Sequence, residues 1–283
     1  MGNSDINLSE NYGLQTAGTG DEDRRLIHFG FDLRGTPDED ARQYLPFLNY
    51  LEAKTGRRFV LRFTPKDGKL DEDLANGVVE VAAVGAVSYL NASQLGNVIP
   101  LARGLNKQGK AVYKSVIVTL PGSAIHSIDD LRGKRMAFGG IDSTQGHIIP
   151  RLSLNAAGIH LDDLATYVYT GSHRSCANAV IDGIADACAM QDTLGETLES
   201  EGKVTIIFSS KNYPSSGIAA NTTLPKEILD KITAALIDFD PTGAHAVELY
   251  NWGRTEMPNG FIVAKDSDYK DMRANLQKLG LLR

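Results

Sequence analysis

The sequence predicts an α/β fold with two lobes, and two observations carry this prediction. From Leu26 onward, apolar strand-like segments alternate with amphipathic helical segments. Two long extended passages, at 111–122 and 204–221, are not promptly followed by helices. The alternation predicts right-handed crossovers and a largely parallel sheet covered on both faces. The extended passages predict a chain that crosses into a second lobe and returns through hinge strands that absorb a domain rotation.

The first strand and helix show the pattern most clearly. An apolar strand is expected at 26–33, followed by a helix at 36–56 with Thr36 as its start signal, Pro37 at its first position and Gly56 as its stop. One face of this helix is apolar at spacings i, i+3, i+4 and i+7: Tyr44, Phe47, Leu48 and Leu51. The helix is therefore expected to bury that face.

The same strand and helix pattern continues along the chain. Further pairs are expected at 57–64 and 67–77, 78–85 and 86–96, 135–140 and 143–158, 166–171 and 172–183, and 185–190 and 191–202, with a further helix at 225–239. The predicted organisation is a flexible acidic tail at 1–23, a first lobe at 24–116 plus 214–283, and a second lobe at 117–213. In such sheets ligands bind at the carboxyl ends of the strands.

Composition and charge exclude several classes of partner. The chain is 42% hydrophobic and 23% charged, and no stretch reaches the roughly 18 apolar residues of a membrane-spanning helix. The net charge is −6, and the first 23 residues carry −5 of it, which leaves −1 for the rest. A folded part with a net charge so close to zero is not expected to have a basic surface for nucleic acid or anionic lipid. A bound anion must be held by local geometry.

The first 23 residues and the two cysteines bear on the compartment. The segment lacks the charged and apolar regions of a secretory signal, and its polar composition favours a flexible tail or linker. It fits a native cytoplasmic start, or a Met-Gly remnant that replaces a removed signal. Two cysteines are too few for a disulfide framework. Cys176 and Cys188 are expected as buried free thiols, with a bridge as the alternative in an oxidising compartment.

A polar cluster follows the strand expected at 135–140. The segment "GGIDSTQGHIIPRLSL" (139–154) places hydroxyls, an amide and an imidazole at the start of a helix, where backbone N–H groups have no partner. Gly146 allows close approach of the backbone. The candidate ligand-binding residues here are Ser143, Thr144, Gln145, Gly146 and His147. Such a nest suits an oxyanion with several acceptor oxygens.

A second turn of the same kind occurs in "YTGSHRSCANAV" (169–180). Ser172 is a candidate N-cap, followed by His173 and Arg174 in the first helical turn. A cation there opposes the helix dipole, so Arg174 points either to solvent or to an anion. Ser and Thr before helices usually serve only as caps. For either turn considered by itself, helix capping without ligand binding is therefore the alternative interpretation. Asp192 at the next helix start completes the candidate ligand-binding residues.

Metal binding and catalysis receive little support. A metal site would use His147, His173, Cys176, Cys188 and Asp192, but their spacing matches no compact ligand motif. Capture of a soft oxyanion by the Cys176 thiol is an equally weak alternative. No nucleophile elbow, Walker loop or dinucleotide-binding glycine motif is present. We therefore expect no cofactor, no bound metal and no enzymatic activity.

Four segments, in order and spacing, resemble the phosphonate and phosphite solute-binding proteins of ABC transporters. They are "FGFDLRG…YLPFLNYLEAKTG", "VEVAAVGAVSYLNA", "GKAVYKSVIVTLPGSAIHSIDDLRGKRMAFGGIDSTQGHIIPRLSLNAAGI" and "TGSHRSCANAVIDGIADACAMQDT". The resemblance implies a type II periplasmic binding protein fold, whose two lobes close on a ligand. The family's Ser-Thr-Ser-Gly loop maps onto 143–146, and its Gly-Ser-His turn maps onto 171–173. The cluster at 142–147 is thereby expected to be an oxyanion cradle.

Three positions depart from that family. Gln145 replaces the second serine of the loop, and Arg174 stands where the family often has a carboxylate that holds an aminoalkyl group. Val84 and the segment "TPKDG" (64–68) lack the aromatic residues that often line the first lobe. Together these differences argue against an aminoalkylphosphonate and leave the identity of the oxyanion open among phosphonate, phosphite and phosphate types.

The resemblance implies a solute-binding protein that captures a small tetrahedral oxyanion for an ABC importer. The alternative is a sensing module that presents the oxyanion to a signalling receptor such as a sensor kinase. The expected partners are the oxyanion and either a transporter permease or a sensor kinase, without nucleic acid. The expected location is periplasmic or extracytoplasmic and membrane-anchored, with a lipid anchor attached through a natural N-terminus that this sequence lacks.

Overall fold

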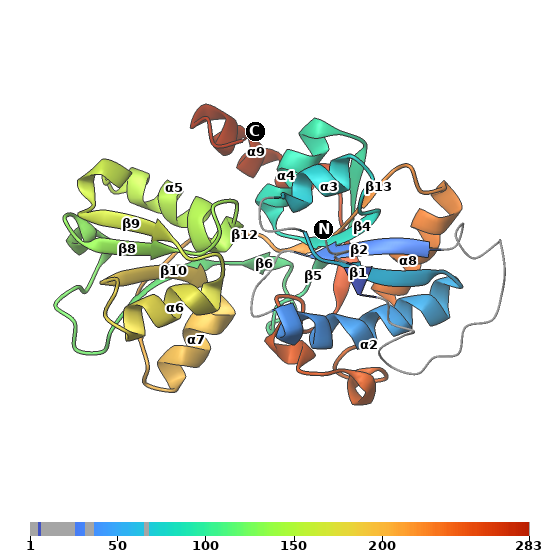
Figure 1. Ribbon diagram of the computed structural model, residues 1–283, viewed down its shortest axis with the longest axis horizontal. Helices are drawn as coiled ribbons and strands as arrows, with labels where there is room; N and C mark the ends of the chain where they lie inside the picture. The colour runs from blue at the N-terminus through green and yellow to red at the C-terminus, as the bar shows by residue number, and fades with distance from the viewer. Residues whose placement is uncertain (1–4, 7–25, 32–36, 65–67, 283) are drawn as a thin grey trace. The chain divides into compact units, whose positions relative to one another are not determined.

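The computed structural model describes residues 5–6, 26–31, 37–64 and 68–282, which divide into two compact units. The described part of unit 1 comprises 5–6, 26–31, 37–64, 68–111 and 214–282, and the described part of unit 2 comprises 112–213. Each unit has its own sheet with helices on both faces (Figure 1). The chain enters unit 2 after Ala111 and leaves it after Tyr213.

Unit 1 is built on a mixed sheet with the strand order β1-β3-β2-β4-β13-β5-β14. The strands are β1 (Asp5–Ile6), β2 (Leu26–Phe31), β3 (Arg58–Arg62), β4 (Val81–Val84), β5 (Val98–Gly104), β13 (Gly217–Asn221) and β14 (Phe261–Val263). Strand β2 is parallel to β3 and β4, whereas β13 is antiparallel to β4 and β5, and β14 is antiparallel to β5. The prediction of a largely parallel sheet is therefore wrong for the pairs that β13 forms with β4 and β5 and that β14 forms with β5. Strand β13 follows an extended passage and not a crossover helix, so nothing forces it to run parallel.

The helices of unit 1 are α2 (Pro37–Thr55), α3 (Leu70–Ala75), α4 (Ala86–Leu95), α8 (Lys226–Ile237) and α9 (Lys270–Lys278). Short 3₁₀ turns occur at η5 (Ala246–Glu248), η6 (Trp252–Arg254) and η7 (Asp266–Tyr269). The predicted apolar face of α2 is confirmed, because Tyr44, Phe47, Leu48 and Leu51 are all buried. They pack in one core with Trp252 and other residues of the chain's last segment.

Unit 2 has a second mixed sheet, with the strand order β11-β7-β10-β8-β9. Its strands are β7 (Ser115–Thr119), β8 (Arg135–Phe138), β9 (Thr166–Tyr169), β10 (Ala187–Gln191) and β11 (Thr205–Ser209). Strand β8 is parallel to β9 and β10, and β7 is antiparallel to β10 and β11. The helical segments are η2 (Ile128–Leu131), the π-helical turn η3 (Thr144–Ile148), α5 (Ile149–Ala156), η4 (Leu161–Asp163), α6 (His173–Ile181) and α7 (Asp192–Ser200).

Two hydrophobic cores lie on opposite faces of the unit 2 sheet. Helix α5 covers one face, where Leu154 packs with Ile117 and Phe138. Helices α6 and α7 cover the other face, where Cys176 and Leu198 pack in the second core (Figure 1). The carboxyl ends of the parallel strands β8, β9 and β10 therefore lie at one edge of the sheet, with a helical segment starting after each.

The two passages that connect the units pair with each other. Strand β6 (Val112–Tyr113) and strand β12 (Tyr213–Pro214) form a two-stranded sheet of their own. They fall inside the two extended passages that the sequence marks as crossings. Strand β7 follows β6 after a single residue, Lys114, so the crossing leads directly into an interior strand of the unit 2 sheet, between β11 and β10.

Several predictions concern residues outside the described ranges. In the tail predicted at 1–23, Asp5 and Ile6 form β1 beside β3, and the rest of the tail lies outside the described residues. The start signal Thr36 and positions 65–67 of the "TPKDG" segment also lie outside them. Among the helices of the described residues, none is long and apolar enough to span a membrane.

Candidate anion-binding site in the second unit

All of the predicted ligand-binding residues lie on three turns at one edge of the unit 2 sheet. The turn at 139–147 follows β8, the turn at 170–174 follows β9, and Asp192 follows β10. Because β8 is parallel to both of its neighbours, the three turns lie at the same end of the sheet. Each turn presents the N-terminus of a helical segment, where backbone N–H groups have no intrahelical acceptor.

The first turn is organised by Ser143. Its hydroxyl oxygen accepts a hydrogen bond from the Gly146 N–H at 3.0 Å, so Ser143 is the N-cap of η3. The Gly139 N–H donates to the Gly146 carbonyl at 2.9 Å, which ties the turn back to the end of β8. Ser143 is only partly buried, whereas Thr144, Gln145, Gly146 and His147 are buried. Because the Ser143 oxygen acts as an acceptor here, its own proton can be donated elsewhere.

Gly146 brings the first and second turns into contact. A Cβ atom at this position would lie 2.8 Å from the Ser143 Oγ, 3.0 Å from the His173 Cε1 and 3.1 Å from the Gly139 Cα. No real side chain fits at such distances, so the close approach requires glycine. The structure therefore places His173, from the second turn, directly against the first turn. The close approach that Gly146 permits here is to the Gly139 backbone and the His173 ring.

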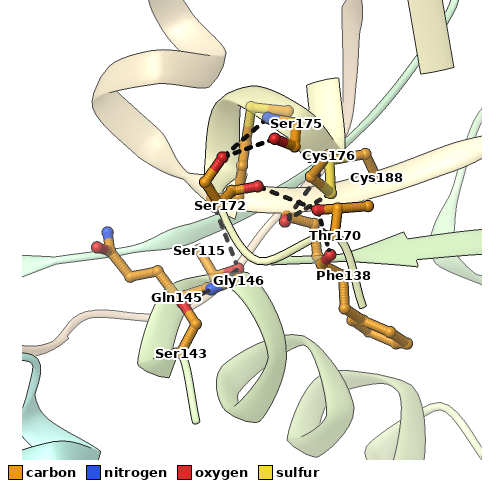
Figure 2. Close-up of a disulfide and its surroundings, with 12 residues drawn as sticks. Ser115, Phe138, Ser143, Gln145, Gly146, Thr170, Ser172, Ser175, Cys176 and Cys188 are labelled. Carbon is orange, nitrogen blue, oxygen red and sulfur yellow. Dashed lines mark hydrogen bonds between the residues drawn. A yellow bond between two sulfur atoms is a disulfide. The ribbon is translucent and has the colours of Figure 1, made fainter. Parts of the chain in front are cut away.

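The second turn is organised by Ser172. Its hydroxyl oxygen accepts from the Ser175 N–H at 3.1 Å and lies 3.0 Å from the Ser175 hydroxyl, so it caps α6 (Figure 2). Thr170 supports the turn by donating to the Phe138 carbonyl at 2.8 Å, with the Ser172 carbonyl at 3.1 Å from the same hydroxyl. Sequence analysis missed Thr170. A hydroxyl that follows a strand is the only signal it gives in the sequence.

Gln145 is directed into the protein. Its side-chain amide donates to the Lys114 carbonyl at 2.7 Å and lies 3.3 Å from the Asp192 Oδ1. Its backbone carbonyl accepts from the Ser115 hydroxyl at 2.6 Å. These contacts tie the first turn to the start of β7. In this arrangement the two amide hydrogens of Gln145 are directed at protein acceptors, although the sequence suggested Gln145 as a ligand donor.

Asp192 holds the same region together. Its carboxylate accepts from the Lys114 N–H at 2.9 Å and from the Thr193 N–H at 2.9 Å, in addition to Gln145. Both backbone groups of Lys114 are therefore hydrogen-bonded: its N–H donates to Asp192, and its C=O accepts from Gln145. These contacts give Asp192 a supporting role at the first turn.

Both ring nitrogens of His147 contact other groups of the protein. Its Nδ1 lies 2.6 Å from the Ile141 carbonyl and its Nε2 lies 3.1 Å from the Tyr169 hydroxyl. Burial lowers the pKa of His147, and the Arg151 charge contributes in the same direction. Burial raises the pKa of Tyr169, so its hydroxyl keeps its proton and donates to the Nε2. Both ring nitrogens of the neutral imidazole are thus used inside the protein, and sequence analysis missed Tyr169 as the partner.

Arg174 differs from these residues. It lies in the first turn of α6 and is partly exposed. Among the described residues, the structure gives its guanidinium no hydrogen bond and no ion pair. Its charge opposes the helix dipole at this position, and an anion at the neighbouring turns would compensate it.

The two cysteines are joined, which corrects the expectation of free thiols. Cys176 of α6 and Cys188 of β10 form a disulfide, and both residues are fully buried (Figure 2). Packing of α6 on β10 brings their Cα atoms to 5.7 Å, within the range that a disulfide spans. Capture of an oxyanion by a Cys176 thiol is therefore excluded, and two of the proposed metal ligands are lost. Within the described ranges no group of three His, Cys, Asp or Glu side chains could hold a metal ion.

Comparison with known proteins identifies the family. Residues 29–269 match the family described as "ABC transporter, phosphonate, periplasmic substrate-binding protein". The chain is 25% identical over 205 residues to the phosphate-import protein PhnD of Mycolicibacterium smegmatis, covering 67% of this chain and 64% of that one. It is 24% identical over 231 residues to the phosphonates-binding periplasmic protein of Escherichia coli, covering 78% and 68%. The chain thus spans about two thirds of the length of these curated relatives.

Solved structures show the same fold. PhnD1 of Prochlorococcus marinus, solved in complex with methylphosphonate, has a TM-score of 0.79 at 17% identity and covers 91% of this chain and 99% of that one. SsuA of Xanthomonas axonopodis pv. citri, an alkanesulfonate-binding protein bound to MOPS, has a TM-score of 0.63 at 18% identity and covers 92% and 94%. The predicted type II periplasmic binding protein fold is confirmed.

The disulfide agrees with an extracytoplasmic protein, because disulfides persist in oxidising compartments such as the periplasm. The family match extends over both units and includes all three turns at the edge of the unit 2 sheet. This chain belongs to the family of periplasmic substrate-binding proteins of phosphonate ABC transporters.

Proposed function

We propose that this protein captures a small tetrahedral phosphorus oxyanion for an ABC importer. The ligand is of the phosphonate, phosphite or phosphate type. The observation that carries the proposal is the contact between the two turns of unit 2, where His173 packs against Gly146 and Gly139. Two helix N-termini are thereby brought side by side at the carboxyl ends of β8 and β9.

The donors at these turns suit a tetrahedral anion. Backbone N–H groups at the start of η3 and α6 provide a partial positive charge, and the Ser143 hydroxyl has a proton to donate. An oxyanion with three or more acceptor oxygens can accept from several such donors at once. We assign direct contact to the turns at 143–146 and 172–174.

The remaining candidate residues are assigned supporting roles. Gln145 and Asp192 fix the first turn on Lys114, and His147 fixes it on Tyr169. A rigid turn keeps its donors in position and reduces the ordering cost when a ligand binds. By the sequence resemblance, Gln145 takes the place of a serine in the family's loop. This exchanges a short hydroxyl for an amide that reaches Lys114, the residue before β7.

Arg174 supports a ligand without a cationic group. A positive charge in the first turn of α6 attracts an anion and repels an ammonium group at the same place. We therefore propose that simple phosphonates, phosphite or phosphate bind more tightly than aminoalkylphosphonates.

The family favours the importer role over the sensor role, because its members are components of ABC transporters. The names of two relatives support the same ligand class: one is a phosphate-import protein, and the other is a phosphonates-binding protein. A transporter permease is accordingly the proposed partner. Attachment to the membrane through a lipid stays a prediction.

Isothermal titration calorimetry tests this function. The purified protein, checked to be folded and free of ligand, is titrated with phosphate, phosphite, methylphosphonate, 2-aminoethylphosphonate and sulfate. We expect one site per chain for at least one phosphorus oxyanion, with weaker binding of 2-aminoethylphosphonate. Silence with every phosphorus oxyanion would contradict the proposal.

Two variants of Arg174 test the preference against amines. Arg174→Glu should lower affinity for methylphosphonate and raise the relative affinity for 2-aminoethylphosphonate, with Arg174→Ala in between. Lys107→Glu reverses the charge of an exposed side chain in unit 1 and serves as the control. If Arg174→Glu and Lys107→Glu bind both ligands as the unmodified protein does, Arg174 has no role in selectivity.

A further inference from the structure

Gln191 is a buried polar residue that none of the contacts above uses. It is the last residue of β10 and the N-cap position of α7, and its side chain is only 6% exposed. Its amide oxygen is buried and has no hydrogen-bond partner among the described residues. A buried acceptor without a partner is rare in folded proteins and costs stability, so its retention calls for an explanation.

The strand pattern of β10 shows on which side the Gln191 amide lies. Along β10, Ala187 and Ala189 face the core beneath α5, whereas Cys188 and Met190 face the core beneath α6 and α7. Alternation along the strand therefore turns Gln191 to the side of α5 and of the preceding turn η3.

The neighbour of Gln191 on β7 supports this placement. Gln191 is in register with Ser115, and the Ser115 hydroxyl donates to the Gln145 carbonyl in η3 at 2.6 Å. Paired residues on neighbouring strands point to the same face of a sheet, so Gln191 faces the same side as Ser115, which contacts the first anion-binding turn. Strand β10 contacts η3 and ends at Gln191. This is the carboxyl end of the strand, where a ligand of this fold is expected.

The donors of Ser115, Gln145 and Lys114 are already used. Ser115 donates to Gln145, the Gln145 amide is directed at Lys114 and Asp192, and the Lys114 N–H is bonded to Asp192. A partner for the Gln191 oxygen must therefore come from outside this set, and it must be a hydrogen-bond donor. An oxyanion supplies such a donor when it keeps a proton.

We propose that Gln191 is a further ligand-contacting residue, whose amide oxygen accepts a hydrogen bond from the P–OH group of a protonated phosphorus oxyanion. The inference rests on the proposed function and adds a selectivity to it. Phosphate and methylphosphonate retain a P–OH group near neutral pH, and phosphite retains one at mildly acidic pH. Sulfate and alkanesulfonates have lost theirs, so they leave the Gln191 oxygen without a partner and bring oxygen acceptors close to it.

Methylphosphonate and methanesulfonate are the matched pair of probes, because they differ in the central atom and in the retained proton. Their affinities are measured by calorimetry and competition at one mildly acidic pH, for the unmodified protein, Gln191→Leu and Gln191→Glu. The unmodified protein should prefer methylphosphonate by at least about 100-fold, since sites built to bond a hydroxyl reject analogues that lack it.

In Gln191→Leu, which removes the acceptor at similar size, methylphosphonate affinity should fall roughly tenfold or more and the preference over methanesulfonate should shrink. In Gln191→Glu, which keeps an acceptor, the preference should be retained or increased. Gln43→Leu is the matched control: Gln43 is a glutamine of unit 1 that is 8% exposed, and its substitution should not change either affinity.

The outcomes separate this inference from the proposed function. If the unmodified protein binds no phosphorus oxyanion, the proposed function fails. If it binds methylphosphonate and Gln191→Leu keeps both the affinity and the preference, the role of Gln191 is wrong. Should Gln191→Leu fail to fold, Gln191→Glu decides the matter, because loss of the preference in that variant also overturns the proposal.

Discussion

The side-chain amide of Gln145 donates a hydrogen bond to the Lys114 carbonyl at 2.7 Å. Lys114 is the residue between β6, by which the chain enters unit 2, and β7, an interior strand of the unit 2 sheet. A side chain of the candidate anion-binding turn is therefore bonded to the backbone beside the crossing. Asp192 holds the N–H of the same residue at 2.9 Å. A movement of the turn on ligand binding would be transmitted to the crossing segment through these bonds.

Removal of the Gln145 amide should loosen this connection. Gln145→Ala leaves the Lys114 carbonyl without its side-chain donor, and the loss of buried hydrogen bonds should lower the free energy of unfolding by about 1–3 kcal/mol. Chemical denaturation measures this change, and hydrogen exchange at the amides of 114–115 should become faster. Gln108→Ala, at an exposed glutamine, should change stability by less than about 0.5 kcal/mol. Equal effects of the two substitutions would contradict the supporting role of Gln145.

Gly146→Ala should disturb the contact between the two turns. The added methyl group would meet the Ser143 Oγ, the His173 ring and the Gly139 backbone within 3.1 Å, so the turns must separate. Overpacking of this kind costs about 1–3 kcal/mol of stability, and methylphosphonate affinity measured by calorimetry should fall as well. Gly253→Ala places its methyl in open space and should be neutral in both measurements. A tolerated Gly146→Ala would show that the turns need not approach so closely.

The neutral His147 should make stability depend on pH. Its folded-state pKa lies below the ordinary value of 6.5, so below that pH the unfolded chain binds a proton that the folded protein excludes. The contribution of His147 to the free energy of unfolding is therefore fully present above about pH 6.5. Below that pH the free energy of unfolding decreases as the pH falls, by at most about 1.4 kcal/mol per pH unit. Denaturation of the unmodified protein and of His147→Gln between about pH 5 and 7.5 should show a smaller slope in the variant. Identical slopes would contradict the buried neutral state.

The disulfide should contribute to stability. It closes a loop with a sequence separation of 12, for which a cross-link is worth about 2–4 kcal/mol. The double substitution Cys176→Ala with Cys188→Ala should lower the melting temperature, and a reductant should have no further effect on that variant. Thiol titration of the denatured unmodified protein should detect no free thiol before reduction. Two free thiols in that assay would show that the bridge does not form.

Much of the fold could be predicted from the sequence because local patterns determine it. The apolar face of α2 repeats at helical spacing, and the strand and helix pairs of unit 2 are marked by glycines and caps. The antiparallel direction of β7 and β13 could not be predicted in the same way, because it depends on how the crossing passages pair.

The position of the candidate site could be predicted, but the direction of its side chains could not. A helix start after a strand is visible in the sequence, so the turns at 143–147 and 172–174 were found. The partners of Gln145 and His147 are Lys114 and Tyr169, which are 31 and 22 residues away along the chain. Only the packing of the sheet brings them together. The disulfide could not be predicted for the same reason, because the distance between Cys176 and Cys188 depends on how α6 packs on β10.

Ser143→Ala, compared with Ser127→Ala, tests the central claim most directly. Both serines precede a helical segment of unit 2, and Ser127 donates to Asp130 at 3.0 Å in a turn outside the candidate site. A hydrogen bond to a charged partner is worth roughly 1.5–3 kcal/mol, so Ser143→Ala should weaken methylphosphonate binding about 10- to 100-fold in calorimetry. Ser127→Ala should bind normally. If both variants lose similar stability and Ser143→Ala keeps its affinity, Ser143 is only a helix cap, and the turn is not the anion site.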